Sequence, residues 1–258
     1  MNTVKDICRR IVGGGYVYST NAYPYMATIW YLDGEEFKFK SGATYIGKRY
    51  FLTAAHCTRK KDLRMMLVRM GDINLKKLPK TYRVVKVHTH PNFNSNTLHN
   101  DIAIIEVDKD VNVEPVRLVC EHLRDFCYNY GVMVKVLGFG KDCASSSQQH
   151  LMDMKEVDLK IKPIEESRYH RSLITGEMFL AGNIISGKIV DACTGDSGGP
   201  CLCNIKGKWV LVGIVSWGSG CGKKDLPGVY TKVISFLPWI RSICCLLYTS
   251  DAADDTPC

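Results

Sequence analysis

Short apolar or alternating segments, separated by turn residues such as Gly, Asn, Asp and Pro, run through most of the chain. The first series covers residues 26–32, 43–46, 50–54, 66–69, 82–87 and 102–107, within a stretch from about 25 to 116. A second series covers 132–137, 156–161, 178–181, 210–217 and 228–233. Many short strands at this spacing favour an antiparallel sandwich or barrel. The pattern therefore predicts an all-β protein with two strand-rich parts, from about 25 to 116 and from about 132 to 233.

Two segments depart from this strand pattern. Residues 117–131 separate the two series and are predicted to form a linker, and the polar stretch 143–149 is predicted to be a loop. Residues 235–244 predict a short amphipathic helix, with Ser235 as its N-cap and Phe236, Ile240 and Ile243 on one face.

The last fourteen residues, 245–258, do not continue the pattern. Their sequence, CLLYTSDAADDTPC, resembles the translation of a sequencing-library transposase adaptor. We expect a non-native tail here and exclude it from the fold. Of the 12 cysteines, Cys245 and Cys258 belong to this tail.

Composition and charge exclude several classes of protein. The hydrophobic content of 46% and the charged content of 23% are ordinary for a globular protein. The net charge of +8 could suggest a polyanion partner, but Lys and Arg are scattered, which favours a solvated surface and no nucleic-acid site. The chain has no run of about 18 apolar residues, so no membrane span is predicted.

The cysteines and the first residues bear on localisation. The high cysteine count favours a secreted protein, and the alternative is a cytosolic protein with reduced thiols. Residues 1–10 contain no apolar signal-peptide core, so we expect the true start of the protein to lie upstream.

The stretch 191–200, DACTGDSGGP, is the strongest chemical signal. Its three glycines and Pro200 exclude a helix or a regular strand and predict a tight loop. Ser197 in this loop is a candidate nucleophile, and nearby backbone N–H groups are candidate oxyanion donors. The alternative is a Gly-rich surface turn.

Three further positions complete a candidate constellation. His56 ends an apolar run in LTAAHC and is a candidate base, although a histidine at a strand end is more often structural. Asp101 opens the apolar run DIAII and is a candidate acid, although a solvated turn residue is the common alternative. Arg10 precedes IVGG, so cleavage after it would free the α-amine of Ile11.

Five markers occur in one order along residues 11 to about 244: IVGG, TAAHC, DIAI, GDSGGP and the Ser-Trp-Gly of 216–218. Together they resemble the trypsin/chymotrypsin-like serine proteases, in their trypsin-like branch. The resemblance implies two packed, antiparallel six-stranded β-barrels with a short C-terminal helix. It also implies a propeptide remnant over 1–10 and one peptidase domain over 11–244.

The resemblance implies a role for each marker residue. Ser197 would be the nucleophile, His56 the general base and acid, and Asp101 the group that orients the imidazole. The backbone N–H groups of Gly195 and Ser197 would form the oxyanion hole.

The resemblance also implies activation by proteolysis. Cleavage after Arg10 would let the amine of Ile11 pair with Asp196, so the chain is predicted to be a zymogen. An activating trypsin-like protease and protein protease inhibitors are the expected partners, and no cofactor or metal is expected.

Specificity follows from the same resemblance. Asp191 would form the floor of the S1 pocket, so that substrates carry Arg or Lys at P1, with Ala192 favouring Arg over Lys. The remaining expected substrate-binding residues are Ser216, Trp217, Gly218 and Gly228. The first three of these would pair with the substrate strand.

The cysteines depart from the family pattern. Ser41 stands where the family has a cysteine, so Cys57 loses its usual partner. The resemblance implies a Cys193–Cys221 disulfide and allows Cys8–Cys120. The sequence does not pair the others, which are Cys57, Cys127, Cys143, Cys201, Cys203 and Cys244.

Two alternatives to an active enzyme remain. A non-catalytic homologue would act as a binding or cofactor protein, but such a homologue usually lacks a triad residue or has a filled S1 pocket. In this sequence the three triad residues, Gly195 and Asp191 are all present. A polyanion-binding protein is supported only by the net charge. The sequence therefore favours a secreted serine endopeptidase.

Overall fold

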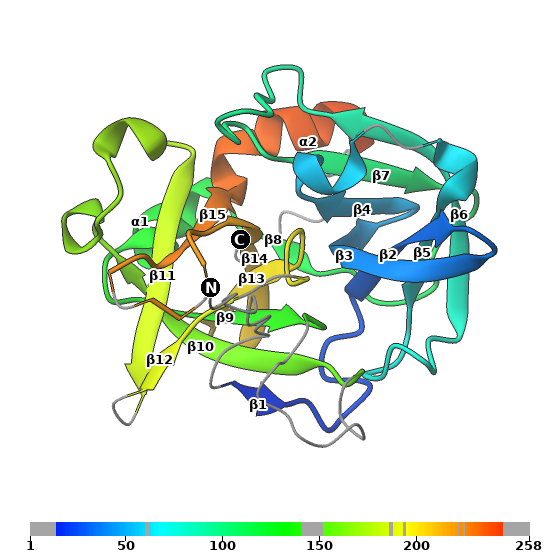
Figure 1. Cartoon of the computed structure of the whole chain (residues 1–258), viewed down its shortest axis with the longest axis horizontal. Helices are drawn as coiled ribbons and strands as arrows, with labels where there is room; N and C mark the ends of the chain where they lie inside the picture. The colour runs from blue at the N-terminus through cyan, green and yellow to red at the C-terminus, as the bar shows by residue number, and fades with distance from the viewer. Residues whose placement is uncertain are drawn as a thin grey trace, which may run out of the picture.

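The computed structural model describes residues 14–59, 62–140, 152–185, 188–192, 195–220, 222–223 and 225–244. The expected propeptide, the loop 143–149 and the tail 245–258 lie outside these ranges. Within them, the strands form two barrels that lie side by side (Figure 1).

The first barrel is closed by six antiparallel strands in the order β2-β3-β4-β7-β6-β5. They are β2 (Met26–Asp33), β3 (Glu36–Gly47), β4 (Tyr50–Thr53), β5 (Met66–Met70), β6 (Lys80–Thr89) and β7 (Ala103–Val107). Alternation drives this closure, because Met66, Val68 and Met70 of β5 are buried while Leu67 and Arg69 between them are only partly buried. The short β4 and β7 are instead buried along nearly their whole length.

The second barrel contains six strands in the order β10-β9-β13-β14-β15-β11 and closes through pairing of β10 with β11. They are β9 (Met133–Gly138), β10 (Lys155–Lys162), β11 (Met178–Ile185), β13 (Pro200–Ile205), β14 (Lys208–Trp217) and β15 (Gly228–Lys232). Three short strands add to its edges: β1 (Gly15–Tyr16), β8 (Arg117–Leu118) and β12 (Lys188–Val190). The expected pair of six-stranded barrels is confirmed.

Two local predictions were wrong. The predicted linker contains β8, a 3-10 turn over Glu121–Leu123 and the short helix α1 (Arg124–Tyr128). These residues are structured because they pack on the second barrel: Cys127 is fully buried, and Tyr128 Oη donates to the Val212 carbonyl at 2.6 Å.

The second error concerns the start of the C-terminal helix. Helix α2 spans Leu237–Cys244, and Ser235 lies before it in a 3-10 turn over Val233–Phe236, so Ser235 is not the N-cap. The predicted apolar face holds, since Phe236 and Ile240 are buried. Packing of Phe236 and Trp239 around the ring of His90, each with ring centroids 5.0 Å apart, fixes this end against the first barrel.

Contacts between the barrels gather where β3, β13 and the loop before β13 meet. The Gly42 N–H of β3 donates to the Ser197 carbonyl at 2.9 Å, and Phe39 packs edge-on against Phe139 with centroids 6.3 Å apart. The predicted Ser197 loop is therefore held between the two barrels.

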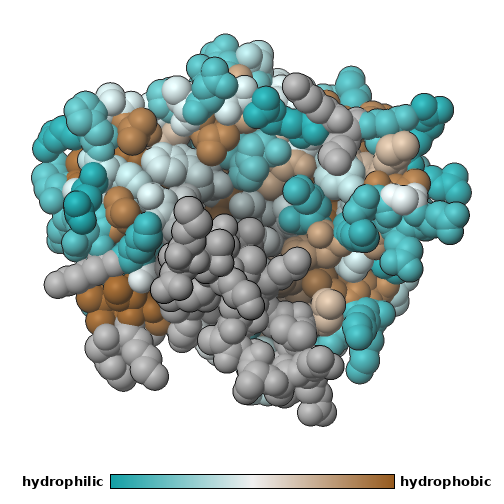
Figure 2. All heavy atoms as spheres, viewed as in Figure 1, coloured by the Kyte–Doolittle hydropathy of each residue, from teal (hydrophilic) through white to brown (hydrophobic). Residues whose placement is uncertain are grey.

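Polar side chains are prominent on the face of the molecule shown in Figure 2. In Figure 2, hydrophilic side chains cover much of the upper and right-hand parts of the face, and hydrophobic side chains occur in separate patches. Among the described residues, no helix has both the length and the apolar character that crossing a membrane requires.

Candidate active site

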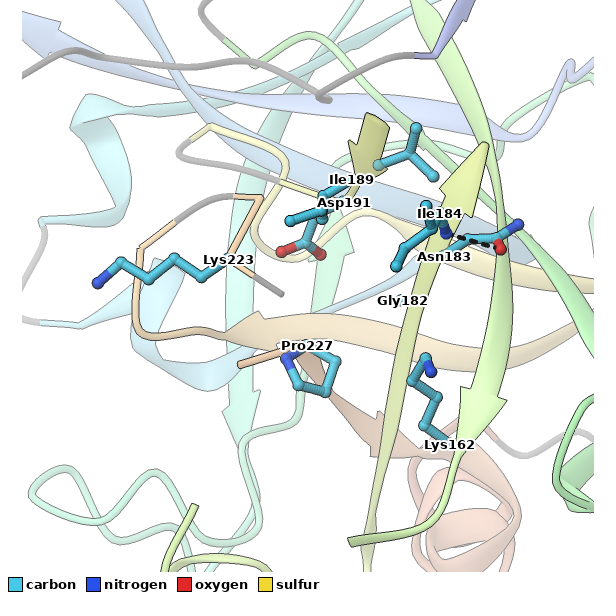
Figure 3. Close-up of a pocket in the computed structure, with 9 residues that line it drawn as sticks. Lys162, Gly182, Asn183, Ile184, Ile189, Asp191, Lys223 and Pro227 are labelled. Carbon is cyan, nitrogen blue, oxygen red and sulfur yellow. Dashed lines mark hydrogen bonds between the residues drawn. The ribbon is translucent and has the colours of Figure 1, made fainter. Parts of the chain in front are cut away.

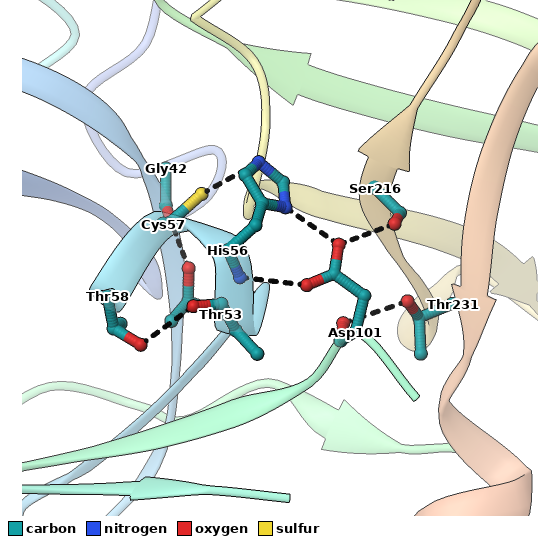
Figure 4. Close-up of polar contacts among 9 residues, drawn as sticks. Gly42, Thr53, His56, Cys57, Thr58, Asp101, Ser216 and Thr231 are labelled. Atoms are coloured by element: carbon teal, nitrogen blue, oxygen red, sulfur yellow. Dashed lines mark hydrogen bonds and ion pairs between the residues drawn. The ribbon is translucent and has the colours of Figure 1, made fainter. Parts of the chain in front are cut away.

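His56 and Asp101 meet because β4 and β7 pair antiparallel. His56 lies in the 3-10 turn Ala55–Thr58 just after β4, and Asp101 lies two residues before β7, at the same end of the pair. His56 Nδ1 donates to Asp101 Oδ2 at 2.7 Å, and the His56 backbone N–H donates to Oδ1 at 2.9 Å (Figure 4). This arrangement fixes the proton on Nδ1 and leaves Nε2 as the acceptor.

Asp101 is held by donors from both barrels. Its side chain is 1% exposed, and Oδ2 also accepts from Ser216 Oγ at 2.6 Å. Thr231 Oγ1 donates to the Asp101 backbone carbonyl at 2.9 Å. Several donors therefore replace water around this buried carboxyl group and fix its position.

The environment of His56 stabilises its charged form. Burial opposes the imidazolium, but the hydrogen bonds with Asp101 and Cys57 outweigh burial and raise the pKa of His56 to about 10. The side chain remains 25% exposed and therefore faces solvent as well as Asp101. The contact with Asp101 thus stabilises the imidazolium that forms once Nε2 has accepted a proton.

Ser197 sits in a loop that only glycine-rich sequence allows. Gly198 has φ of +77°, and a Cβ there would overlap Thr53 Oγ1 and the Gly42 carbonyl. The Gly198 N–H donates to Val215 O at 2.8 Å, which ties the loop to β14. Gly195 also has a positive φ, of 98°. The predicted tight loop is therefore present around Ser197.

A cavity of about 300 Å³ opens beside these residues. Its lining includes His56 and Ser197 together with every residue expected in the S1 pocket, namely Asp191, Ala192, Ser216, Trp217, Gly218 and Gly228. It also includes residues that the sequence did not indicate: Leu98, Val215, Gly220, Val229 and Tyr230. Leu98 has a φ of 56° in a loop between strands, and no motif marks such a position.

One residue that lines the cavity is a buried acid, Asp191. Asp191 is 2% exposed, and burial raises its pKa to about 7, although backbone hydrogen bonds oppose the shift. Its Oδ2 accepts from the Gly222 N–H at 3.3 Å. Within the part of the chain that the structure describes, Asp191 Oδ1 and Tyr230 Oη have no hydrogen-bond partner. These two oxygens can therefore receive N–H donors from a cationic ligand.

The two glycines beside Asp191 keep the cavity open. A Cβ on Gly228 would lie 3.0 Å from both Asp191 Oδ1 and Tyr230 Oη, and a Cβ on Gly218 would lie 3.9 Å from the Gly228 Cα. Side chains at these positions would occupy the space between the walls. The sequence places glycine at both.

A second, smaller cavity of about 20 Å³ also touches Asp191 (Figure 3). Lys162, Asn183 and Pro227 contribute to its lining, and the Lys223 side chain points away from the carboxylate in this view. The volume is enough for one water molecule. This cavity belongs to the surroundings of the S1 floor.

Asp196 is also buried, at 0% exposure, and its Oδ1 accepts from the Gly140 N–H at 2.9 Å. A Cβ on Gly138 would overlap its carboxylate, so glycine is needed beside it. Arg10 and Ile11 lie outside the described residues, and their predicted link to Asp196 stays a prediction.

The predicted disulfides involve cysteines outside the described residues. Cys8, Cys143, Cys193 and Cys221 lie outside the described residues, so the pairs Cys193–Cys221 and Cys8–Cys120 stay predictions. Cys57, Cys127, Cys201 and Cys203 are free thiols. The hydrogen bond between the Cys127 and Cys203 side chains raises the pKa of Cys127 and lowers that of Cys203. In the described part of the chain, no three His, Cys, Asp or Glu side chains group to hold a metal.

Comparison with known proteins identifies the family. The family model described as Trypsin matches residues 11–240. The chain belongs to the trypsin family. Trypsin of Sus scrofa is 35% identical over 233 residues, which cover 88% of this chain and 93% of that protein.

Two further relatives agree with this assignment. Tissue-type plasminogen activator of Sus scrofa is 33% identical, with 90% of this chain and 44% of that protein covered. CLIP domain-containing serine protease B10 of Anopheles gambiae is 32% identical, with 93% and 70% covered. The trypsin-family chain is therefore a serine protease, a hydrolase.

Proposed function

We propose that the protein is a secreted serine endopeptidase that cleaves peptide bonds after Arg or Lys through an acyl-enzyme. One observation carries this proposal: Ser197, the His56–Asp101 pair and a buried carboxylate all border one cavity. A substrate side chain that enters this cavity can therefore meet the Asp191 carboxylate while the scissile bond lies beside Ser197.

The chemistry that we propose for the three residues is the one that the family implies, and the contact between His56 and Asp101 supports it. Ser197 Oγ attacks the scissile carbonyl, and His56 Nε2 takes the serine proton and later gives it to the leaving amine. Asp101 keeps the other imidazole proton on Nδ1 at 2.7 Å and stabilises the imidazolium. The Gly195 and Ser197 N–H groups receive the developing oxyanion, and each such donor contributes about 10²–10³ in rate.

Specificity is assigned to Asp191. A buried carboxylate with one free oxygen, beside an unpaired Tyr230 hydroxyl in the described part of the chain, fits the several N–H donors of a guanidinium. An ammonium has a single donor centre, and Ala192 offers it no hydroxyl. Arg is therefore preferred over Lys at P1. Ser216, Trp217 and Gly218 receive the substrate backbone along the edge of β14.

Activation is assigned to the N-terminus. Cleavage after Arg10 by a trypsin-like protease frees Ile11, whose amine pairs with the buried Asp196 beside the Ser197 loop. The protein is then a zymogen, with an activating protease, extracellular protein substrates and protein protease inhibitors as partners.

A P1 substrate panel tests this function. The chain is treated with immobilised trypsin, which is then removed, and peptide amides that differ only at P1 are compared. The proposal expects kcat/KM to fall in the order Arg, Lys and then Phe, and the Arg activity to vanish in Asp191→Ser. Activity that favours Phe, or that survives unchanged in Asp191→Ser, contradicts the S1 assignment.

A further inference from the structure

Cys57 is a free thiol in direct contact with the proposed base. Its Sγ lies 3.4 Å from His56 Nε2, the nitrogen that Asp101 does not hold (Figure 4). Ser41 leaves this cysteine without the disulfide partner that the family resemblance implies. The thiol therefore faces the same nitrogen that must accept the Ser197 proton.

The three groups repeat the arrangement that activates a nucleophile. A thiol lies within hydrogen-bond reach of an imidazole, and a carboxylate 2.7 Å from the other ring nitrogen orients that imidazole. An imidazole placed in this way takes the proton of the group beside it, and the thiolate is the reactive form of cysteine. The contact thus places a thiol where the imidazole can accept its proton, at a position that the serine mechanism does not use.

Exposure distinguishes Cys57 from three other free thiols, which are Cys127, Cys201 and Cys203. Cys57 is 6% exposed, and its neighbour His56 borders the open cavity. Cys127 and Cys201 are 0% exposed and Cys203 is 1% exposed. Burial raises the pKa of Cys201 well above its usual value, and Cys127 and Cys203 hydrogen-bond each other. Of these four thiols, Cys57 is therefore the one that a small reagent reaches most readily.

We propose that Cys57 is a modification site for small disulfides, and that the mixed disulfide it forms reversibly switches off the His56 base. This proposal rests on the proposed function for its effect on activity, because the modified thiol would stand against the nitrogen that serves Ser197.

The exchange balances without an external oxidant. His56 Nε2 takes the proton of the Cys57 thiol, and Sγ attacks one sulfur of the small disulfide. The new S–S bond forms as the old one breaks, and the leaving thiolate takes the proton back from His56. A small thiol, such as the medium supplies under reducing conditions, reverses each step and restores the free Cys57.

Methylthiolation of the activated enzyme tests the switch. The enzyme is first titrated with a serine-directed phosphonate, so that its starting activity reports the proposed function separately. It is then treated with S-methyl methanethiosulfonate, and amidolysis and peptide masses are followed together. Modification of Cys57 is expected to lower activity by about 10² or more, the usual contribution of a general base, and dithiothreitol is expected to restore it.

Matched variants separate the site from other cysteines. Cys57→Ala is expected to retain its activity under the same treatment. Inactivation of Cys57→Ala to the same degree as the unsubstituted enzyme would overturn the proposal, and so would full activity after complete modification of Cys57. Failure to modify Cys57 at all would also overturn it.

Labelling rates test the role of His56 without any need for protease activity. Ser197→Ala keeps the Cys57–His56 contact and is expected to label at the unsubstituted rate. His56→Phe keeps the ring volume but removes Nε2, and it is expected to label about tenfold more slowly or worse. Equal labelling of His56→Phe and Ser197→Ala would show that His56 does not activate this thiol.

Discussion

Asp101 forms hydrogen bonds with residues of both barrels at the site. Its carboxylate holds His56 from the first barrel and accepts from Ser216 Oγ of the second barrel, and its backbone carbonyl accepts from Thr231 Oγ1. The bonds from His56 and Ser216 replace water around a carboxylate that is almost fully buried. The position of the imidazole therefore depends on correct docking of the barrels as well as on the local turn.

Asp191 is a second buried acid, and its surroundings leave it able to bind a ligand. Asp101 is surrounded by side-chain donors, whereas Asp191 Oδ1 has no partner among the described residues. Burial raises the pKa of Asp191 to about 7, above the ordinary value of 3.8. Its contribution to stability is therefore present below the unfolded value of about 4 and is lost as the pH rises through about 7.

This shift predicts how a cationic ligand binds. Benzamidine needs the ionised carboxylate, so its apparent Kd should improve about tenfold for each pH unit up to about 7 and then level off. Inhibition measured from pH 5 to 9 checks this. The matched variant Asp191→Asn should bind weakly at every pH, and a Kd that does not change between pH 5 and 7 would rule out the raised pKa.

At the scale of elements, the backbone of β3 lies directly against the backbone of the loop before β13, with no side chain between Gly42 and Gly199. A Cβ on Gly42 would lie 2.7 Å from the Gly199 Cα and 2.9 Å from its nitrogen. Neither neighbour is a side chain that could move aside. The Gly42 N–H also donates to the Ser197 carbonyl, so strand β3 fixes the position of the loop that carries Ser197.

Gly42→Ala should therefore displace Ser197. The overpacking should cost about 1–3 kcal/mol of unfolding free energy, and misplacement of the nucleophile should lower kcat/KM by about 10². Gly176→Ala is the matched control, since nothing lies within 4 Å of a Cβ there. Chemical denaturation and amidolysis measure both effects, and equal behaviour of the two variants would contradict this role of Gly42.

Some secondary-structure elements could be predicted from the sequence and others could not. Strands with alternating burial, such as β5, were found within a residue or two, because the pattern has period two. Strand β13 was missed because Pro200 and the glycines before it mark a loop, while Cys201 and Leu202 are buried without alternation. The linker prediction failed because burial of Cys127 depends on contacts with the second barrel.

The residues of the candidate site likewise fall into those that the sequence predicts and those that depend on the folded structure. Residues within contiguous motifs, such as His56, Asp191 and Ser197, could be placed from sequence, and all three border the cavity. Leu98 and Tyr230 could not, because their access to the cavity depends on a loop conformation and on barrel closure. The contact between Cys57 and His56 Nε2 likewise depends on side-chain direction within a 3-10 turn.

At the scale of the whole molecule, the site lies between two barrels and can be disturbed from either. Asp196 stands one residue before Ser197, is fully buried and accepts from the Gly140 N–H after β9. A buried carboxylate favours a neighbour of opposite charge. A new α-ammonium at Ile11 would supply that charge and couple cleavage of the chain to the geometry of the loop.

Activation should therefore depend on one bond. Arg10→Gln should resist trypsin at this position and show no amidolytic activity, while Arg9→Gln should be activated as the unsubstituted chain is. N-terminal sequencing and amidolysis before and after trypsin treatment measure this. Full activity of intact Arg10→Gln would exclude the zymogen mechanism.

Labelling of Ser197 by a fluorescent phosphonate with a basic P1 group tests the central claim most directly. After trypsin treatment, the account predicts one phosphonylated residue, Ser197, with labelling that benzamidine blocks and that His56→Ala abolishes. A properly folded, Ile11-terminated protein that takes no label at Ser197, or that labels equally well in His56→Ala, would contradict it.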